Sequence, residues 1–269
     1  MLPGGSGTSQ DRWQTVGRAA VVLDGASSFT PALVDAQEYV DHLLTRIAKG
    51  LAHDRTSLRQ VVADGIRRTA EELELPTRGG PSSTVLIASN DSDSLKILAL
   101  GDSTAVVHTV DGRVHRITDD RLSTVGIDHR KAYRDRLSSG SGYDEVHKEI
   151  LRTLQEEELE WRNRPGGYWI AESDPQATNE AVEREFHAED VDWFILATDG
   201  AQRAIDHLGI EWSRVARMST PELEDLLKRL HRWEETEDRR ATLLPRAKLH
   251  DDKTIVVWHP LMRPEVHQA

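Results

Sequence analysis

Cysteine is absent from the sequence. Its absence excludes disulfides, thiolate nucleophiles, zinc–thiolate sites and iron–sulfur clusters. Long apolar runs are missing as well: the longest, such as residues 193–197, are only as long as a strand, and residues 1–11 are rich in glycine and serine. We therefore expect neither a membrane span nor an apolar signal region. By default, we expect a cytoplasmic protein without membrane contact.

Positive charge is also scarce. The chain has 34 Lys and Arg residues against 46 Asp and Glu residues, which gives a formal net charge of -12. Such a chain repels a phosphate backbone, and no basic stripe with interleaved aromatic residues offsets the repulsion, so nucleic acid is not an expected partner. An acidic protein that handles an anionic substrate must neutralise that charge locally, which bound divalent cations can do.

The length of 269 residues fits one large domain, and we predict a single domain over residues 1–269. The stretch at about residues 119–165 is the most polar part of the interior of the sequence. It is the expected place for a mobile insertion near a functional site.

Short apolar runs rich in β-branched residues and bounded by Gly, Asp or Ser predict strands. The pair Asp111-Gly112 favours a type I′ turn, and hence an antiparallel hairpin over residues 104–117. The predicted strands cover residues 19–23, 84–88, 95–100, 104–110, 113–117, 168–171, 193–197 and 254–258.

Apolar residues at helical spacing predict four helices. The first begins at Thr30-Pro31, an N-cap followed by a proline at the first helical position, and runs to about Gly50. Ser57 caps the second, the third covers about residues 144–161, and the fourth begins at Thr220. Helix pairs separated by hairpin-linked strands predict an α+β sandwich with helices over central sheets.

Four predicted strand ends share one feature: each meets an aspartate, in most cases beside a glycine. Carboxylates at the ends of buried strands are rigidly held, and an adjacent glycine lets a backbone carbonyl approach the same cation. Mg²⁺ and Mn²⁺ prefer such all-oxygen ligands. Each aspartate alone also fits an ordinary turn residue, so the argument depends on finding four in one chain. The four read Leu23-Asp24-Gly25, Gly101-Asp102-Ser103, Thr198-Asp199-Gly200 and His250-Asp251-Asp252.

These motifs resemble the protein phosphatase 2C family of metal-dependent serine/threonine phosphatases across nearly the full chain. Each motif is weak alone, and their order along the chain is the specific part. The resemblance implies a four-layer αββα sandwich, in which two central antiparallel sheets are flanked by pairs of helices. In family order, the landmarks are Gln10-Asp11-Arg12, Asp24-Gly25, residues 80–84, Gly101-Asp102-Ser103, Asp199-Gly200 and Asp251-Asp252-Lys253-Thr254.

The resemblance also implies a role for each aspartate at a site with two divalent cations, Mn²⁺ or Mg²⁺. Asp24 would bridge the two metals, the carbonyl of Gly25 would bind one of them, and Asp199 and Asp251 would bind the other. These three aspartates are the expected catalytic residues. Asp102 corresponds to a residue linked to a weaker third metal. Asp11 would contribute behind the metal ligands or at that third position.

The sequence departs from the family pattern at the N-terminal residues that would bind the substrate phosphate and a metal. Many relatives have an arginine four residues before the N-terminal acidic pair, where this chain has Ser6, and the first member of that pair is Gln10. Arg12 is a candidate replacement for the missing phosphate ligand, although a surface arginine beside Trp13 explains it equally well. Of the 12 histidines, only His250 beside Asp251 attracts attention, and loop polarity explains it as well.

We therefore interpret the chain as a phosphatase that hydrolyses phosphoserine or phosphothreonine on a protein substrate through water activated by two metals. A cognate serine/threonine kinase is an expected partner. The alternative is a pseudophosphatase that binds a phosphoprotein or kinase without turnover, favoured by Gln10 and the missing arginine. A phosphatase of the haloacid dehalogenase type is disfavoured, because neither Asp24 nor Asp199 is followed two residues later by a second aspartate.

Overall fold

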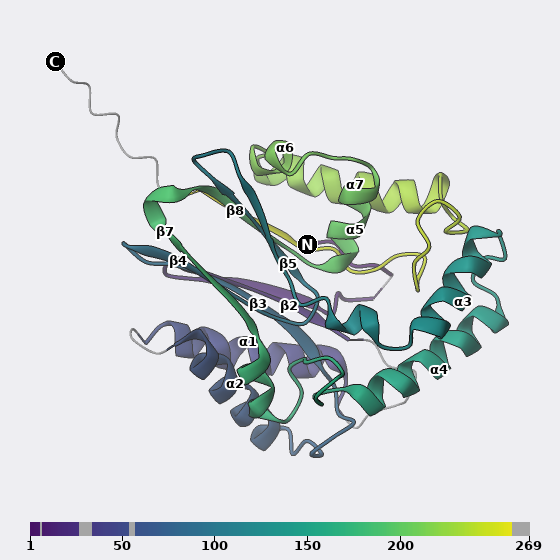
Figure 1. Cartoon of the computed structure of the whole chain (residues 1–269), viewed down its shortest axis with the longest axis horizontal. Coiled ribbons are helices and arrows are strands. Elements are labelled where there is room, and N and C mark those ends of the chain that lie inside the picture. The colour runs from purple at the N-terminus through teal and green to yellow at the C-terminus, as the bar shows by residue number, and fades with distance from the viewer. Residues whose placement is uncertain (6, 27–33, 54–56, 260–269) are drawn as a thin grey trace.

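The computed structural model describes residues 1–5, 7–26, 34–53 and 57–259. Two antiparallel sheets lie face to face, with helices α1 and α2 on the outer face of one sheet and α5 to α7 on the outer face of the other (Figure 1). The helices are α1 (Ala36–Leu51), α2 (Leu58–Glu72), α3 (Ile127–Ser138), α4 (Glu145–Trp161), α5 (Asp199–His207), α6 (Trp212–Ala216) and α7 (Thr220–Thr236).

The larger sheet has the order β1-β2-β3-β4-β7, and the smaller has the order β6-β5-β8-β9. All the paired neighbours run antiparallel. The strands are β1 (Asp11–Val16), β2 (Ala19–Gly25), β3 (Ser83–Asn90), β4 (Ser94–Leu100), β5 (Thr104–Thr109), β6 (Val114–Ile117), β7 (Val182–His187), β8 (Val191–Ala197) and β9 (Ile255–Trp258).

The alternation of side chains along each strand builds the layers. In β2, Val21 and Leu23 point toward α1 and α2, where they pack in one core cluster with Tyr39 and Leu43. The intervening Val22 points the other way, into the space between the two sheets. Because successive side chains of a strand face opposite sides, a strand buried on both faces is apolar throughout. The predicted αββα sandwich is thereby confirmed.

Most predicted elements are present, and their caps explain where they begin. Ser57 accepts a hydrogen bond from the backbone N–H of Gln60, as expected of an N-cap. Helix α7 begins behind Ser219 with a capping box and a proline in its first turn. For α1 the structure shows Asp35 as the N-cap, so the predicted start at Thr30-Pro31 is wrong, and residues 30–33 lie outside the described residues.

The prediction of a strand at residues 168–171 is wrong. Tyr168 and Ala171 make only isolated bridges, to Arg162 and Ser83 respectively. The strand that completes this sheet is β7, which sequence patterning missed. Both missed strands, β1 and β7, are at the edges of the larger sheet, where one side faces solvent and charged residues replace the apolar alternation.

The hairpin of β5 and β6 is confirmed, but its turn is not of type I′. Only Gly112 of the pair Asp111-Gly112 has a positive φ, at 83°. The Gly112 N–H donates to the carbonyl of Thr109 at 2.8 Å, and the Thr109 N–H donates to that of Arg113 at 2.9 Å. A turn closed in this way, with one left-handed glycine after it, connects strands through a longer loop with a bulge.

The polar segment at residues 119–165 contains α3 and α4, which pack against each other at one end of the sandwich (Figure 1). Their shared core includes Tyr133, Leu137, Leu151 and Leu154. The mobility of this segment stays a prediction. Within the described part of the chain, no helix is long and apolar enough to cross a bilayer.

We predict that Leu86→Ala, which removes a fully buried side chain between the two sheets, lowers the free energy of unfolding by about 2 to 5 kcal/mol. Leu243→Ala is the matched control, because its side chain is 57% exposed and the expected change is within about 0.5 kcal/mol. Urea denaturation measures both. Equal effects of the two substitutions would contradict this assignment of the core.

Candidate metal centre

The register of the larger sheet places two of the predicted site residues opposite each other. Asp11 begins β1 and pairs with Asp24 at the end of β2, and Asp24 pairs on its other side with Thr84 of β3. The backbone N–H of Asp24 donates to the Thr84 hydroxyl at 3.2 Å. Gly25 follows in the same strand, and a Cβ there would lie 3.0 Å from the Gln10 carbonyl oxygen, so the close approach favours glycine.

Asp11 is fully buried and links the two sheets. Its Oδ2 accepts hydrogen bonds from the hydroxyls of Thr198 at 3.0 Å and Thr254 at 2.7 Å. Those threonines border β8 and β9 of the smaller sheet, and the Thr254 N–H donates to the Thr198 hydroxyl at 3.0 Å. The other oxygen, Oδ1, is buried without a hydrogen-bond partner. Such an orphan oxygen needs a ligand, since burial of an unsatisfied polar group is costly.

Asp199 and Asp251 come from the smaller sheet. Asp199 is the first residue of α5, where the positive end of the helix dipole favours a carboxylate. Asp251 lies in the loop before β9, and that loop packs on α5 so closely that a Cβ at Gly200 would meet the Asp252 carbonyl oxygen at 2.1 Å. The sequence pair Asp199-Gly200 thus brings the two segments into contact.

Asp102 lies in the turn that carries the chain from β4 in one sheet to β5 in the other. Gly101 before it has φ of +92° and lies against Thr84, so a side chain there would be both strained and obstructed. Ser103 after it makes a hydroxyl–hydroxyl hydrogen bond of 2.7 Å with Thr84. The turn is therefore fixed to the strand that neighbours Asp24.

Asp252 has a different position from Asp251. Its two carboxylate oxygens accept the backbone N–H groups of Gly4 at 2.6 Å and Gln10 at 2.5 Å. It thereby fastens the N-terminal segment to the loop that carries Asp251. The next residue continues this attachment, because Lys253 and Leu2 exchange backbone hydrogen bonds of 2.8 and 2.9 Å.

The candidate centre contains five aspartates that affect one another electrostatically: Asp11, Asp24, Asp102, Asp199 and Asp251. Burial is the main cause that raises the pKa of Asp11 to about 7. Burial and the charge of Asp199 raise the pKa of Asp102 to about 7. Burial, followed by the charge of Asp11, raises the pKa of Asp24 well above its ordinary value, and burial with the charge of Asp251 raises that of Asp199. Burial and mutual repulsion thus both favour the neutral form of these carboxylates.

The donor set fits hard divalent cations. It consists of carboxylate oxygens and a backbone carbonyl, which Mg²⁺ and Mn²⁺ prefer. A bound cation would stabilise the charged form of these buried carboxylates. A cavity of about 420 Å³, here called the acidic cavity, is lined by Asp102, Asp199 and Asp251 among other residues. All three, like Asp24, keep part of the residue exposed, so small ions can reach them.

Two cationic side chains border the aspartates, and sequence reasoning missed both. Lys248 Nζ lies 3.1 Å from Asp251 Oδ1, and Arg203 Nη1 lies 3.9 Å from Asp199 Oδ2. Both line the acidic cavity. Burial lowers the pKa of Lys248, but the charges of Asp251, Asp24 and Asp199 outweigh it and leave that pKa raised. Lys248 is therefore a full positive charge at the edge of the cluster.

Arg12, the candidate phosphate ligand from the sequence, has other partners. Its Nε donates to Asp41 Oδ1 at 2.5 Å, and its Nη2 donates to Asp41 Oδ2 at 3.0 Å. Its Nη1 donates to the carbonyls of Ser9 and Asp11 at 2.5 and 2.8 Å. These contacts join α1 to the start of β1. Ser6, which occupies the position of the family arginine, lies outside the described residues.

His250 belongs to a network beside the centre. His250 Nδ1 lies 2.9 Å from Glu234 Oε2, which also accepts from the fully buried Lys253 ammonium at 2.8 Å. Lys253 in turn donates to the Asp251 carbonyl at 3.0 Å, so helix α7 supports the Asp251 loop.

The same network offers one compact set of metal-type ligand atoms. Over the described ranges, His231, Glu234 and His250 are the one group with three such atoms within 4.8 Å of one another, and the five aspartates are spaced more widely. The His231 and His250 rings are stacked 3.6 Å apart with an interplanar angle of 13°. Since a metal lies near the plane of each ligating ring, two stacked rings do not present one cation with both nitrogens. Glu234 is moreover already paired with Lys253.

Comparison with known protein families shows to which family the chain belongs. A family model described as protein phosphatase 2C matches residues 6–250. The chain belongs to the protein phosphatase 2C family. The predicted resemblance to this family is thus confirmed. A comparison with curated protein sequences gives no match.

Solved structures of the family share the fold at low sequence identity. Serine/threonine phosphatase Stp1 from Staphylococcus aureus is 14% identical with a TM-score of 0.57, covering 97% of this chain and 93% of its own. PstP/Ppp from Mycobacterium tuberculosis is 16% identical with a TM-score of 0.51, covering 96% and 94%. The catalytic domain of PstP in complex with two manganese ions is 17% identical with a TM-score of 0.50, covering 96% and 94%.

Several residues of this family site carry no distinctive sequence signal. Thr198 and Thr254 flank the aspartate motifs, but a threonine at a strand end gives no hint that its hydroxyl binds an aspartate from the other sheet. Lys248 is visible as a cation three residues before Asp251. Arg203 is visible as a basic residue one helical turn after Asp199, a spacing that favours an ion pair.

We predict that Gly200→Ala displaces the Asp251–Asp252 loop, because the added Cβ would overlap the Asp252 carbonyl oxygen. Overpacking of this kind costs about 1 to 3 kcal/mol of folding free energy and should also weaken binding of Mn²⁺. Gly80→Ala is the control, since its Cβ would meet only Pro76 at 3.8 Å. Isothermal titration with Mn²⁺ and thermal melts measure both effects; unchanged Mn²⁺ affinity in Gly200→Ala would contradict the close packing of α5 on this loop.

Proposed function

We propose that the chain is a metal-dependent phosphatase that removes phosphate from phosphoserine or phosphothreonine on protein substrates. One observation carries the proposal: five aspartates converge from both sheets beside one cavity, and burial raises the pKa values of four of them, Asp11, Asp24, Asp102 and Asp199. Membership of the protein phosphatase 2C family gives that convergence its reaction class. A cognate kinase as partner and a cytoplasmic location stay predictions.

The proposed metal ligands are the residues expected from the sequence. Asp24, the carbonyl of Gly25, Asp199 and Asp251 would hold two divalent cations, Mn²⁺ or Mg²⁺, and Asp102 would serve a weaker third. Asp11 would contribute behind the metal ligands or at that third position, through its orphan Oδ1. When bound, two such cations supply Lewis-acid activation of water and neutralise phosphate charge. The PstP catalytic domain with two manganese ions shares this fold, which supports the assignment.

Lys248 and Arg203 are proposed to bind the substrate phosphate in place of the arginine that the sequence lacks. Five carboxylates carry more negative charge than two divalent cations neutralise, so an arriving phosphate dianion needs further positive charge. Both side chains line the acidic cavity and lie at its aspartates. Arg203 is also oriented by a hydrogen bond of 3.0 Å from its Nη2 to the Pro245 carbonyl. Charge-assisted hydrogen bonds of this type bind phosphate strongly.

We predict that Asp199→Asn abolishes metal-dependent hydrolysis of p-nitrophenyl phosphate and of a phosphothreonine peptide, with a loss of at least about 100-fold in kcat. The reason is the loss of a charged metal ligand. Rates are measured with Mn²⁺, with Mg²⁺ and with chelator. The matched control is Asp225→Asn on α7, whose side chain is 76% exposed and forms an ion pair with Lys228.

The outcomes separate the two readings of the family site. Metal-dependent turnover that Asp199→Asn removes and Asp225→Asn keeps supports the phosphatase. A folded protein that binds Mn²⁺ but hydrolyses neither substrate would favour the pseudophosphatase and would overturn the proposed activity.

We predict that saturating Mn²⁺ raises the melting temperature of the wild-type chain, because the cation binds the native state alone. At a concentration of about 100 times Kd, the expected stabilisation is about 2.7 kcal/mol. Chelator should reverse it, and Asp199→Asn should lose most of it. Differential scanning calorimetry measures the effect; a melting temperature that does not respond to Mn²⁺ or Mg²⁺ contradicts the metal centre.

We predict that Lys248→Met raises KM for the phosphothreonine peptide by about 10-fold to 100-fold, the loss expected for one charge-assisted hydrogen bond. Mn²⁺ affinity should stay the same or increase, since a competing cation leaves Asp251. Lys248→Arg should restore part of the KM, and Lys228→Met is the control. Tighter Mn²⁺ binding with an unchanged KM would show that Lys248 is only a counter-ion of the aspartates.

A further inference from the structure

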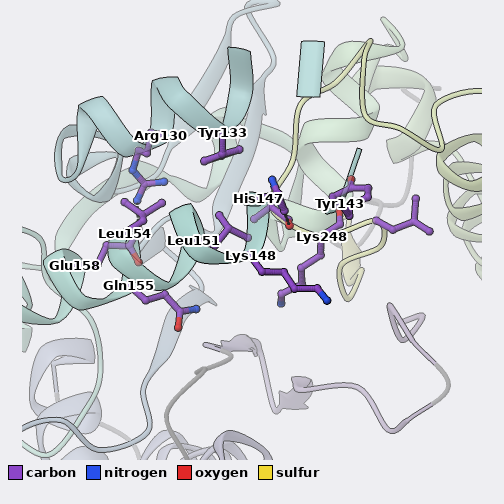
Figure 2. A pocket seen from close by; sticks show the side chains of 12 residues that line it. Arg130, Tyr133, Tyr143, His147, Lys148, Leu151, Leu154, Gln155, Glu158 and Lys248 are labelled. Atoms are coloured by element: carbon purple, nitrogen blue, oxygen red, sulfur yellow. Dashed lines mark hydrogen bonds and ion pairs between the residues drawn. The ribbon is translucent and has the colours of Figure 1, made fainter. Parts of the chain in front are cut away.

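A second cavity, of about 580 Å³, lies between helices α3 and α4 and the loop at residues 247–249. Figure 2 shows Tyr133, His147 and Leu151 of the helices on the side that faces Lys248 of the loop. Its lining is mostly aromatic and aliphatic, and we call it the apolar cavity. The residues that line it are Arg130, Tyr133, Tyr143, His147, Lys148, Leu151, Leu154, Gln155, Glu158, Ala247, Lys248 and Leu249.

The apolar cavity adjoins the acidic cavity. Arg130, Tyr133, Glu158, Ala247 and Lys248 line both of them. Lys248 stands at this boundary with its ammonium group on Asp251. A molecule whose phosphate reaches Lys248 therefore has its neighbouring groups at the entrance of the apolar cavity.

The wall of the apolar cavity is already formed. The His147 ring is 2% exposed and lies edge-to-face between two tyrosine rings, with centroid distances of 5.9 Å to Tyr133 and 5.1 Å to Tyr143. His147 Nε2 lies 2.9 Å from the Ala247 carbonyl oxygen, and the Tyr143 hydroxyl donates to the Lys248 carbonyl at 3.0 Å. These bonds fasten α4 and the segment just before it to the loop, so a ligand need not order this wall on binding.

The charged side chains at the apolar cavity are paired with opposite charges. Arg130 Nη2 donates to Glu158 Oε1 at 2.5 Å. Lys148 pairs with Glu145 at 2.6 Å, and Lys248 pairs with Asp251 at 3.1 Å. An uncharged apolar group therefore fits this lining better than a charged one, since a buried charge needs a partner of its own. The cavity volume also falls in the range of about 300 to 1,000 Å³ that is typical of ligand sites.

We propose that the apolar cavity receives an aliphatic or aromatic side chain of the phosphoprotein substrate, close in sequence to the phosphorylated residue. This inference rests on the proposed function and adds a substrate class to it: phosphosites with a large apolar neighbour. The phosphate occupies the acidic cavity at Lys248, and the neighbouring side chain loses its contact with water between α3, α4 and the loop.

The test compares phosphothreonine peptides in which every flanking residue is glycine except one. Leucine is placed in turn at each of the near positions on both sides of the phosphothreonine, and aspartate replaces it in a second set. Burial of a leucine side chain predicts that one leucine position raises kcat/KM by about 10-fold or more over the all-glycine peptide. Aspartate at the same position should give no such increase.

A variant of the chain checks that the preference comes from this cavity. Gln155→Trp places a bulky ring in the apolar cavity, whose lining includes neither Asp199 nor Asp251, so it should remove most of the leucine preference and leave hydrolysis of the all-glycine peptide unchanged. Gln60→Trp, at an exposed position of α2, is the control and should keep the preference. Thermal melts confirm that both variants are folded.

Failure of the inference differs from failure of the proposed function. If all peptides and p-nitrophenyl phosphate are hydrolysed but no leucine position stands out, the apolar cavity is not a substrate site and the phosphatase remains. A leucine preference that persists in folded Gln155→Trp would also overturn the inference. If no phosphate ester is hydrolysed at all, the proposed function fails and this substrate class fails with it.

Discussion

The buried carboxylate of Asp11 is the constraint on which the candidate centre depends. It begins a strand of the larger sheet, yet its bound oxygen is held by Thr198 and Thr254 at the edge of the smaller one. Packing of the two sheets against each other therefore also brings the aspartates together. The interior between the sheets supplies the apolar part of this contact, and the hydroxyl–carboxylate contacts fix its register at the end where chemistry is proposed.

A large part of the architecture could be predicted because it follows from local patterns. Buried strands such as β2 and β8 are continuous apolar runs, and Ser57 and the Thr220-Pro221 pair mark helix starts by capping. The aspartates were visible for a related reason: a polar residue that directly ends an apolar strand stands out. Their convergence, in contrast, required the family order of the motifs, since no local rule joins Asp24 to Asp251.

What could not be predicted depends on contacts between distant segments. The edge strands β1 and β7 look polar because one side faces solvent, and they are strands only because β2 and β4 offer unpaired backbone groups. Helix α3 buries just Tyr133 and Leu137, too few for a periodic stripe. In the sequence, Lys248 looks like any lysine of a loop. Its proposed role depends on its position between two cavities, and no sequence pattern indicates that position.

The chain segments that meet at Asp11 also differ greatly in when they are made. Thr254 is 243 residues further along the chain than Asp11, and Asp252 is 242 residues further than Gln10. During synthesis, the Asp11 carboxylate can gain its first hydroxyl partner only when Thr198 has emerged from the ribosome, and its second only when Thr254 has emerged. The arrangement of the acidic site can therefore be complete only after residue 254 has emerged.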